Sequence, residues 1–163
     1  MSFHILTGPS GPTRGPKING FLTIVRSCQD VMGTFVFGAV FERHPDLKVV
    51  CAEADAGWVP HYLYRMDHAY KRHHNWLAHG ALTKLPSEYF SENISVTFQD
   101  DWVAFKMTGM MNVERLMWAN DFPHSDATWP WSQQMLAEHT GHLDEREKQL
   151  ILHDNVATLY DLP

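Results

Sequence analysis

Residues 116–130 read LMWANDFPHSDATWP, and this stretch decides both the fold and the position of the functional site. Its first four residues are apolar throughout, as expected of a parallel strand covered on both faces. Pro123 and Pro130 prevent the strand from continuing. Asn120 and Asp121 therefore lie at the carboxyl end of a strand, which is where α/β folds bind their ligands. Asp121 is thus the first candidate site residue.

The same change from an apolar run to a polar loop occurs earlier in the chain. Short apolar runs at residues 3–7, 47–52 and 94–98 predict three further strands. Apolar residues recur at helical spacing over 18–43, with a possible break at Gly33, and over 62–77 and 102–111. Residues 8–16 and 80–93 read as loops, and further helices are expected from about 132, from about 144 and over 155–160. This alternating order predicts an α/β fold with a parallel sheet.

Composition restricts the class of protein. A chain of 163 residues that is 44% hydrophobic can bury a core, and we expect one domain over residues 1–163. The net charge of −6 and the scattered basic residues argue against nucleic acid and favour a small-molecule partner. The sequence has neither a signal peptide nor a membrane-length apolar stretch, so a cytoplasmic protein without membrane contact is expected. Cys28 and Cys51 are predicted to be buried free thiols.

The predicted strand ends carry side chains suited to metal-assisted chemistry: His4, Glu53, Gln99, Asp100 and Asp121. An imidazole and a carboxylate that bind one divalent ion, with one position open to water, would lower the pKa of that water towards neutrality. Simpler interpretations stay open at this point. A single histidine in a strand is more often a packed, hydrogen-bonded residue, and Asp121 could merely cap a turn.

Residues 117–130 resemble the last-strand motif of the amidohydrolase-related family, in the branch that includes aminocarboxymuconate-semialdehyde decarboxylase. Residues 42–50, ERHPDLKVV, look like the segment that leads into the sixth strand of that family. Residues 153–162, HDNVATLYDL, look like its terminal helix. The resemblance implies a metal-dependent TIM-type (β/α)8 barrel, of which this chain would supply strands five to eight as a parallel half-barrel.

The resemblance also implies roles for single residues. Asp121 would bind the catalytic metal and accept a proton from bound water, and His4 aligns with the metal-binding histidine of the fifth strand. Glu53 stands where many members have a catalytic histidine, and it would act as the proton carrier. His124 would line the substrate pocket, with apolar walls formed by Phe122 and Trp129. Zinc is the favoured metal and manganese the alternative, and the reaction would be hydrolysis or decarboxylation of a small carboxylate, often an aromatic-derived one.

Two features depart from the family pattern. A (β/α)8 barrel needs about 250 residues, and the family's first-strand His-x-His pair occurs nowhere in this sequence. We therefore expect a truncated chain, and the rival hypothesis is a non-catalytic remnant of such an enzyme. An open half-barrel also predicts a homo-oligomer, poor solubility or dependence on a missing amino-terminal half. The remaining candidate histidines are expected at the surface: His61, His68, His73, His74, His79, His139 and His142.

Overall fold

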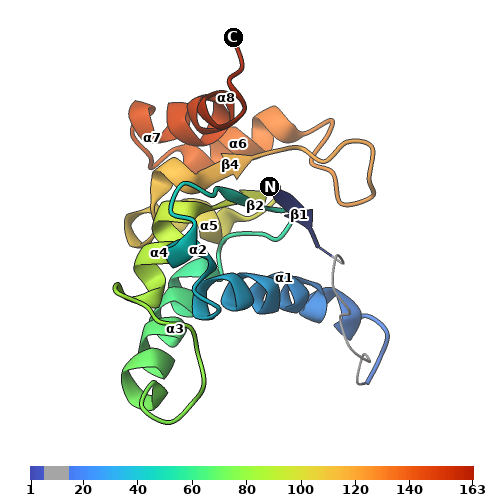
Figure 1. Ribbon diagram of the computed structural model, residues 1–163. Coiled ribbons are helices and arrows are strands. Elements are labelled where there is room, and N and C mark those ends of the chain that lie inside the picture. The colour runs from blue at the N-terminus through green and yellow to red at the C-terminus, as the bar shows by residue number, and fades with distance from the viewer. Residues whose placement is uncertain (6–14) are drawn as a thin grey trace.

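The computed structural model describes residues 1–5 and 15–163, and its centre is one sheet of four parallel strands. In spatial order the strands are β1 (Ser2–His4), β2 (Val49–Ala52), β3 (Ile94–Phe98) and β4 (Leu116–Trp118). The parallel α/β prediction is confirmed (Figure 1). The strand predicted over 3–7 ends at His4, and residues 6 and 7 lie outside the described residues, as does most of the predicted loop 8–16.

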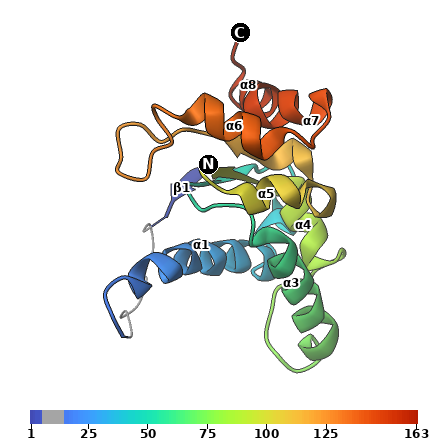
Figure 2. The same cartoon turned by 180° about the vertical axis from the view of Figure 1, so that it is seen from behind.

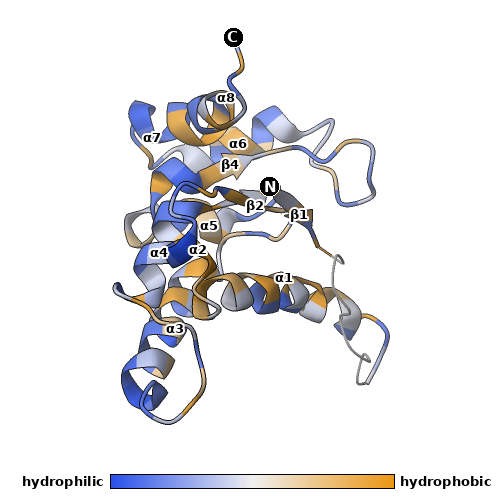
Figure 3. Ribbon diagram, in the orientation of Figure 1, coloured by the Kyte–Doolittle hydropathy of each residue, from blue (hydrophilic) through white to orange (hydrophobic). Residues whose placement is uncertain are grey.

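The strands present one large apolar face to the helices. Phe3, Cys51, Val96 and Leu116 stand in one row across the sheet because each is the register partner of the next. All four belong to the buried hydrophobic core. Successive residues point to opposite faces, so the other face carries a different set that includes Ser2, His4, Ser95, Thr97 and Met117. Hydropathy colouring shows β2 and β4 as apolar and the carboxyl end of α3 as polar (Figure 3).

The helices cover the strands from two sides (Figures 1 and 2). α1 and α3 lie on one side, and α6, α7 and α8 lie beyond β4 on the other. A π-helical turn, η3 (Leu150–Asp154), joins α7 to α8 and packs on β4. The α-helices are α1 (Asn19–Phe37), α2 (Val40–Arg43), α3 (Val59–His73), α4 (Pro86–Asn93), α5 (Trp102–Lys106), α6 (Ser132–Thr140), α7 (Glu145–Gln149) and α8 (Asn155–Tyr160).

The helical segment predicted over 18–43 does break, but Gly33 is not the break. α1 runs through Gly33 to Phe37, and the chain turns at Gly38 and Ala39, where Ala39 has a φ of 53°. Gly33 instead permits a close helix contact, because a Cβ there would lie 2.9 Å from the Tyr62 hydroxyl oxygen of α3. The break therefore comes from a left-handed residue that hydrophobic periodicity does not report.

The prediction of a loop over 80–93 is wrong for its second half, because residues 86–93 form α4. Pro86 opens this helix, where a missing N–H costs no hydrogen bond. The Glu88 carboxylate accepts a hydrogen bond from the Leu85 backbone N–H at 2.8 Å. Tyr89 and Phe90 are each 3% exposed, so burial stabilises the short helix. The helix predicted over 102–111 is shorter than expected: α5 ends at Lys106 and a 3₁₀ turn, η1 (Thr108–Met110), follows.

The two cysteines are buried free thiols, as predicted. Cys28 lies on α1 and Cys51 on β2, so both belong to the interface between helix and sheet. Within residues 1–5 and 15–163, no helix has the length and apolar character needed to cross a membrane.

Candidate metal centre

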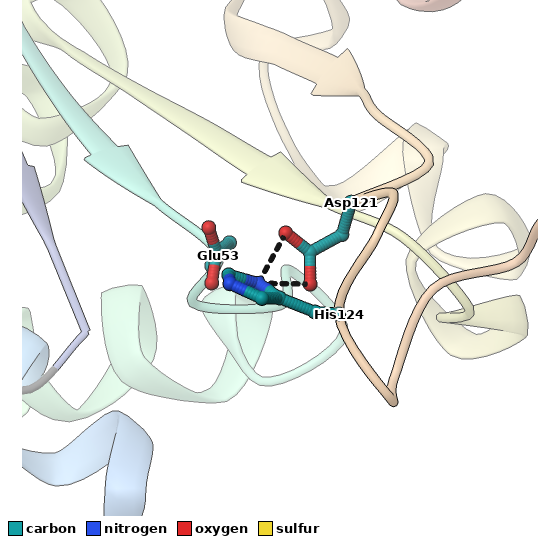
Figure 4. A group of neighbouring side chains, drawn as sticks. All are labelled: Glu53, Asp121 and His124. Carbon is teal, nitrogen blue, oxygen red and sulfur yellow. Dashed lines mark hydrogen bonds and ion pairs between the residues drawn. The ribbon is translucent and has the colours of Figure 1, made fainter.

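Glu53, Asp121 and His124 converge at the carboxyl ends of the strands (Figure 4). One possible ligand atom from each side chain lies within 4.8 Å of the other two. Glu53 follows β2, whereas Asp121 and His124 lie in the loop after β4. We call these three residues the donor group. In the described part of the chain, no other set of three histidine, cysteine or acidic side chains comes together in this way.

Asp121 is held in place by the turn that follows β4. Its φ of 58° is in the left-handed region, which aspartate tolerates better than most residues. The Asp121 carbonyl accepts from the His124 N–H at 3.0 Å, and the Asn120 side chain accepts from the Phe122 N–H at 3.1 Å. The side chain of Asp121 is only 12% exposed. The sharp turn therefore directs a largely buried carboxylate back towards β2.

His124 is oriented by Asp121. Its Nδ1 lies 3.0 Å and 3.1 Å from the two carboxylate oxygens of Asp121. Because an ionised carboxylate only accepts hydrogen bonds, Nδ1 carries the proton, and the neutral ring then has Nε2 as its lone-pair nitrogen. A carboxylate that fixes the tautomer in this way is a common partner of a metal-binding histidine.

Glu53 occupies a second left-handed position, with a φ of 56°. Its backbone N–H donates to the Thr97 hydroxyl of β3 at 2.8 Å, which ties the residue to the neighbouring strand. Its Oε1 lies 2.6 Å from Nε2 of His4, and its side chain is 23% exposed. Glu53 therefore connects the end of β1 with the donor group.

His4 lies outside the donor group and contacts it through Glu53. Both ring nitrogens face oxygen acceptors, because Nδ1 lies 2.6 Å from the Ile5 carbonyl oxygen. The hydrogen bond to Ile5 and the negative charges of Glu53 and Asp121 raise the pKa of His4, while partial burial opposes them. In this arrangement His4 is placed as a proton donor to Glu53. Its assignment as a metal ligand stays a prediction.

The loop after β2 is clamped by Asp101, which sequence reasoning did not single out. Its Oδ2 accepts from the backbone N–H groups of Ala56 at 2.8 Å and Gly57 at 2.7 Å. Its Oδ1 accepts from the Ala104 N–H at 3.0 Å and so caps α5. Of these two roles, only the helix cap could be read from the sequence, because an aspartate directly before a helix is a common cap. The clamp fixes the loop that carries Glu53.

A second acidic residue of this loop, Asp55, is electrostatically perturbed. Although part of its side chain reaches solvent, desolvation raises the pKa of Asp55, and the charges of Asp101, Asp126 and Asp100 raise it further, to about 6. Desolvation is the largest cause of this raised pKa, and the three nearby carboxylates add to it. The rim near the donor group is thus strongly acidic, which favours cations over anions.

The other predicted site residues lie outside the donor group. The rings of Phe122 and Trp129 contact each other edge to face at a centroid distance of 5.0 Å, and both side chains are exposed. Gln99 is buried, and its backbone carbonyl accepts a hydrogen bond from the Trp118 indole N–H at 3.0 Å. Asp100 lies 3.9 Å from His139. None of the seven histidines expected at the surface is buried: His61, His74, His79 and His142 are exposed, and His68, His73 and His139 are half-buried.

A family model described as Amidohydrolase matches residues 2–162, which is nearly the whole chain. A search of curated proteins found no match.

Solved structures that are similar to this chain include two bacterial proteins, a decarboxylase and an amidohydrolase. For 5-carboxyvanillate decarboxylase from Sphingomonas paucimobilis the TM-score is 0.67 and the identity 22%, with 90% of this chain and 41% of that chain covered. For an amidohydrolase from Mycobacterium avium subsp. paratuberculosis the TM-score is 0.75 and the identity 20%, with 97% and 41% covered.

A third similar structure is a dihydroxybenzoic acid decarboxylase from Polaromonas, solved with bound manganese and the inhibitor 2-nitroresorcinol. Its TM-score is 0.68 and its identity 15%, and the match covers 93% of this chain and 48% of that one. At such identities the likeness shows the fold, a parallel half-barrel. This chain spans less than half the length of these three solved proteins.

Proposed function

Since the chain belongs to the amidohydrolase family, we propose that it carries the metal-binding strand ends of a metal-dependent hydrolase or decarboxylase that acts on a small carboxylate. The observation that supports this most directly is the donor group, which unites Glu53, Asp121 and His124 within 4.8 Å from separate parts of the chain. It lies at the carboxyl ends of parallel strands, where barrel enzymes have their active sites.

The donor group fits a divalent ion. Two carboxylates and an imidazole are ligands that zinc and manganese both accept. In a tetrahedral site with bonds of about 2.0 Å, ligand atoms are roughly 3.3 Å apart. The three donor atoms, which lie within 4.8 Å of one another, would therefore move closer together on binding one ion. The sequence-based preference for zinc has no support in the comparisons, and the manganese bound to the Polaromonas enzyme makes manganese the first ion to test.

The residues around the ion are proposed to have two roles, metal binding and proton transfer. A bound divalent ion would supply Lewis-acid activation of water or of a carboxylate. Asp121 would hold it, and His124 could serve as a second ligand once its ring turns from the Asp121 carboxylate that its Nδ1 contacts. Glu53 and His4 share a short contact of 2.6 Å, so a proton can move between them and the reacting group. Glu53 is therefore proposed as the proton carrier and His4 as its positioning partner, and metal binding is the alternative role of each.

An aromatic-derived carboxylate is the finer proposal for the substrate. Phe122 and Trp129 form an exposed aromatic pair on the same loop as Asp121 and His124. Aromatic side chains bind planar apolar rings through stacking and edge contacts. The similar solved structures include decarboxylases of 5-carboxyvanillate and of dihydroxybenzoic acid, which is consistent with a substrate of this class.

A non-catalytic remnant is the second candidate. The sequence leaves this alternative open, since no His-x-His pair occurs in these 163 residues. Such a remnant would keep the fold and need not bind a metal. Metal binding therefore discriminates between the two candidates without any knowledge of the substrate.

The experiment compares metal binding by three purified chains: the wild type, Asp121→Asn and Asp126→Asn. Asp126 is a matched control because it is an exposed aspartate on the same loop and lies outside the donor group. We expect manganese or zinc to bind stoichiometrically and to raise the Tm of the wild type and of Asp126→Asn, but not of Asp121→Asn. A wild type with no bound metal and no rise in Tm would contradict the proposal and support the remnant.

A further inference from the structure

A groove lies between the carboxyl ends of α1 and α3, on the far side of the molecule from the loop between β4 and α6 (Figures 1 and 2). Its volume is about 300 Å³, which is within the range of small-molecule sites. Phe37, Leu77 and Ala78 give it apolar walls. None of its described lining residues belongs to the donor group, so it is a separate feature of the surface.

The walls of the groove are held in place by contacts within the chain. The Gly80 backbone N–H donates to the Phe37 carbonyl at 2.6 Å, which ties the segment after α3 to the end of α1. A Cβ at Gly80 would lie 2.5 Å from that of Ala39, so only glycine permits this approach. The Tyr70 ring contacts the rings of His74 and His79 at centroid distances of 5.1 Å and 5.3 Å. The groove is therefore formed before any ligand binds.

Three histidines supply hydrogen-bonding groups to the groove. Nδ1 of His74 lies 2.9 Å from the Tyr70 carbonyl oxygen, and both ring nitrogens of His79 face backbone carbonyl oxygens. His73 differs from these two, because its Nδ1 is buried and has no hydrogen-bond partner among the described residues. A buried polar group without a partner costs free energy. A ligand oxygen that binds this nitrogen would offset that cost.

The charges around the groove favour an anion. Residues 68–87 contain no aspartate or glutamate, in a chain whose net charge is −6. Lys71 and Arg72 lie in the last turn of α3, and Asp67 already accepts two hydrogen bonds from Ser87, each at 2.9 Å. The carboxyl end of a helix carries about half a negative elementary charge, which these two full positive charges exceed. The local potential therefore attracts negative ligands.

We propose that this groove binds a small planar organic anion of the aromatic carboxylate class, at a site separate from the donor group. The apolar ring of the ligand would lie against Phe37 and Leu77, where aromatic and aliphatic side chains favour a flat apolar surface. The carboxylate would accept a hydrogen bond from Nδ1 of His73 and be attracted by Lys71 and Arg72. This inference goes beyond the proposed function, because it requires neither a metal nor turnover.

The first experiment measures the binding of benzoate to the whole chain by saturation-transfer NMR. A chelator is present, so that no metal at the donor group can bind the carboxylate. We expect a Kd of about 1 mM or tighter, and Asp121→Asn should leave it unchanged. Benzylamine is the matched probe, because it carries the same ring with a positive charge. It should bind at least about tenfold more weakly, and added salt should reduce the difference.

Two matched pairs of variants locate the site. Ala78→Phe fills part of the groove, whereas Ala81→Phe places the same side chain at an exposed position of the same loop, outside the groove. The first should weaken benzoate binding at least about tenfold and the second should not. His73→Phe removes Nδ1 and should also weaken binding, whereas His68→Phe, on the same helix but outside the groove, should not. Circular dichroism verifies that each variant is folded.

Several results would overturn the inference. They are no benzoate binding by the wild type, equally tight binding of benzylamine, a control variant that loses as much affinity as its partner, and full affinity in folded Ala78→Phe or His73→Phe. Binding that Asp121→Asn abolishes would assign benzoate to the donor group instead. Self-association that Ala78→Phe abolishes, measured by sedimentation velocity, would make the groove a contact between copies. A chain that binds benzoate but no metal would retain this inference and reject the proposed function, so the two can fail separately.

Discussion

Asp101→Ala should destabilise the chain more than any other single change to an acidic residue near the donor group. The wild-type carboxylate is 8% exposed and accepts from three backbone N–H groups. Alanine leaves all three without this acceptor. Loss of the helix cap on α5 costs about 1 kcal/mol, and each of the two loop N–H groups costs at least about 1 kcal/mol when left unpaired. The expected loss of unfolding free energy is therefore about 3 kcal/mol.

Urea denaturation followed by circular dichroism at one fixed protein concentration measures this loss. For a chain of 163 residues the Tm should fall by roughly 6–12 °C. Asp100→Ala is the neighbouring control, with a side chain that is 64% exposed, and it should stay within about 0.5 kcal/mol of the wild type. Asp101→Asn retains one acceptor oxygen and should fall between the two.

A loss of less than about 1 kcal/mol of unfolding free energy in Asp101→Ala would refute the reasoning, because three unpaired backbone N–H groups should cost more than that. A loss as large in Asp100→Ala would also refute it, because the effect would then come from the general negative charge of the rim. Metal affinity offers a second readout. Because the clamped loop carries Glu53, Asp101→Ala should weaken metal binding in whatever fraction of the chain remains folded.

Three further predictions concern single positions. Glu53→Gln retains the shape of the side chain but cannot titrate, so under the proposed function turnover should fall at least about tenfold with metal content retained. Loss of metal would make Glu53 a ligand instead. Burial and the charge of Asp30 raise the pKa of Tyr62 from 10.0 to about 12, so the folded state binds this proton more tightly than the unfolded state does. The free energy of unfolding should therefore fall as the pH rises from about 10 to about 12. Tyr62→Phe should remove that pH dependence in alkaline unfolding curves. Gly57→Ala should destabilise by about 1–3 kcal/mol in urea melts, because a Cβ would lie 2.7 Å from the Val103 Cβ; an unchanged midpoint would show that the loop yields easily.

The sequence by itself determined the parallel α/β class and most strand positions. Residues 94–98 are a strand with the predicted bounds, and the apolar runs at 47–52 and 116–119 contain β2 and β4. These runs were readable because a strand buried on both faces needs continuous apolar residues, whatever surrounds it. The candidates Glu53 and Asp121 were found for a similar reason: a polar residue directly after such a run must lie at a strand end.

Tertiary structure decided which of those strand ends meet. His124, predicted to line the substrate pocket, lies beside Glu53 and Asp121, and His4 contacts Glu53. The predicted roles of both histidines stay predictions. Two left-handed residues, Glu53 and Asp121, set these directions, and non-glycine residues in that conformation leave no periodic signal. The loop clamp of Asp101 is equally non-local. Hydrophobic periodicity reports local burial, whereas the convergence of side chains depends on sheet register and on loop turns, which only the folded chain brings together.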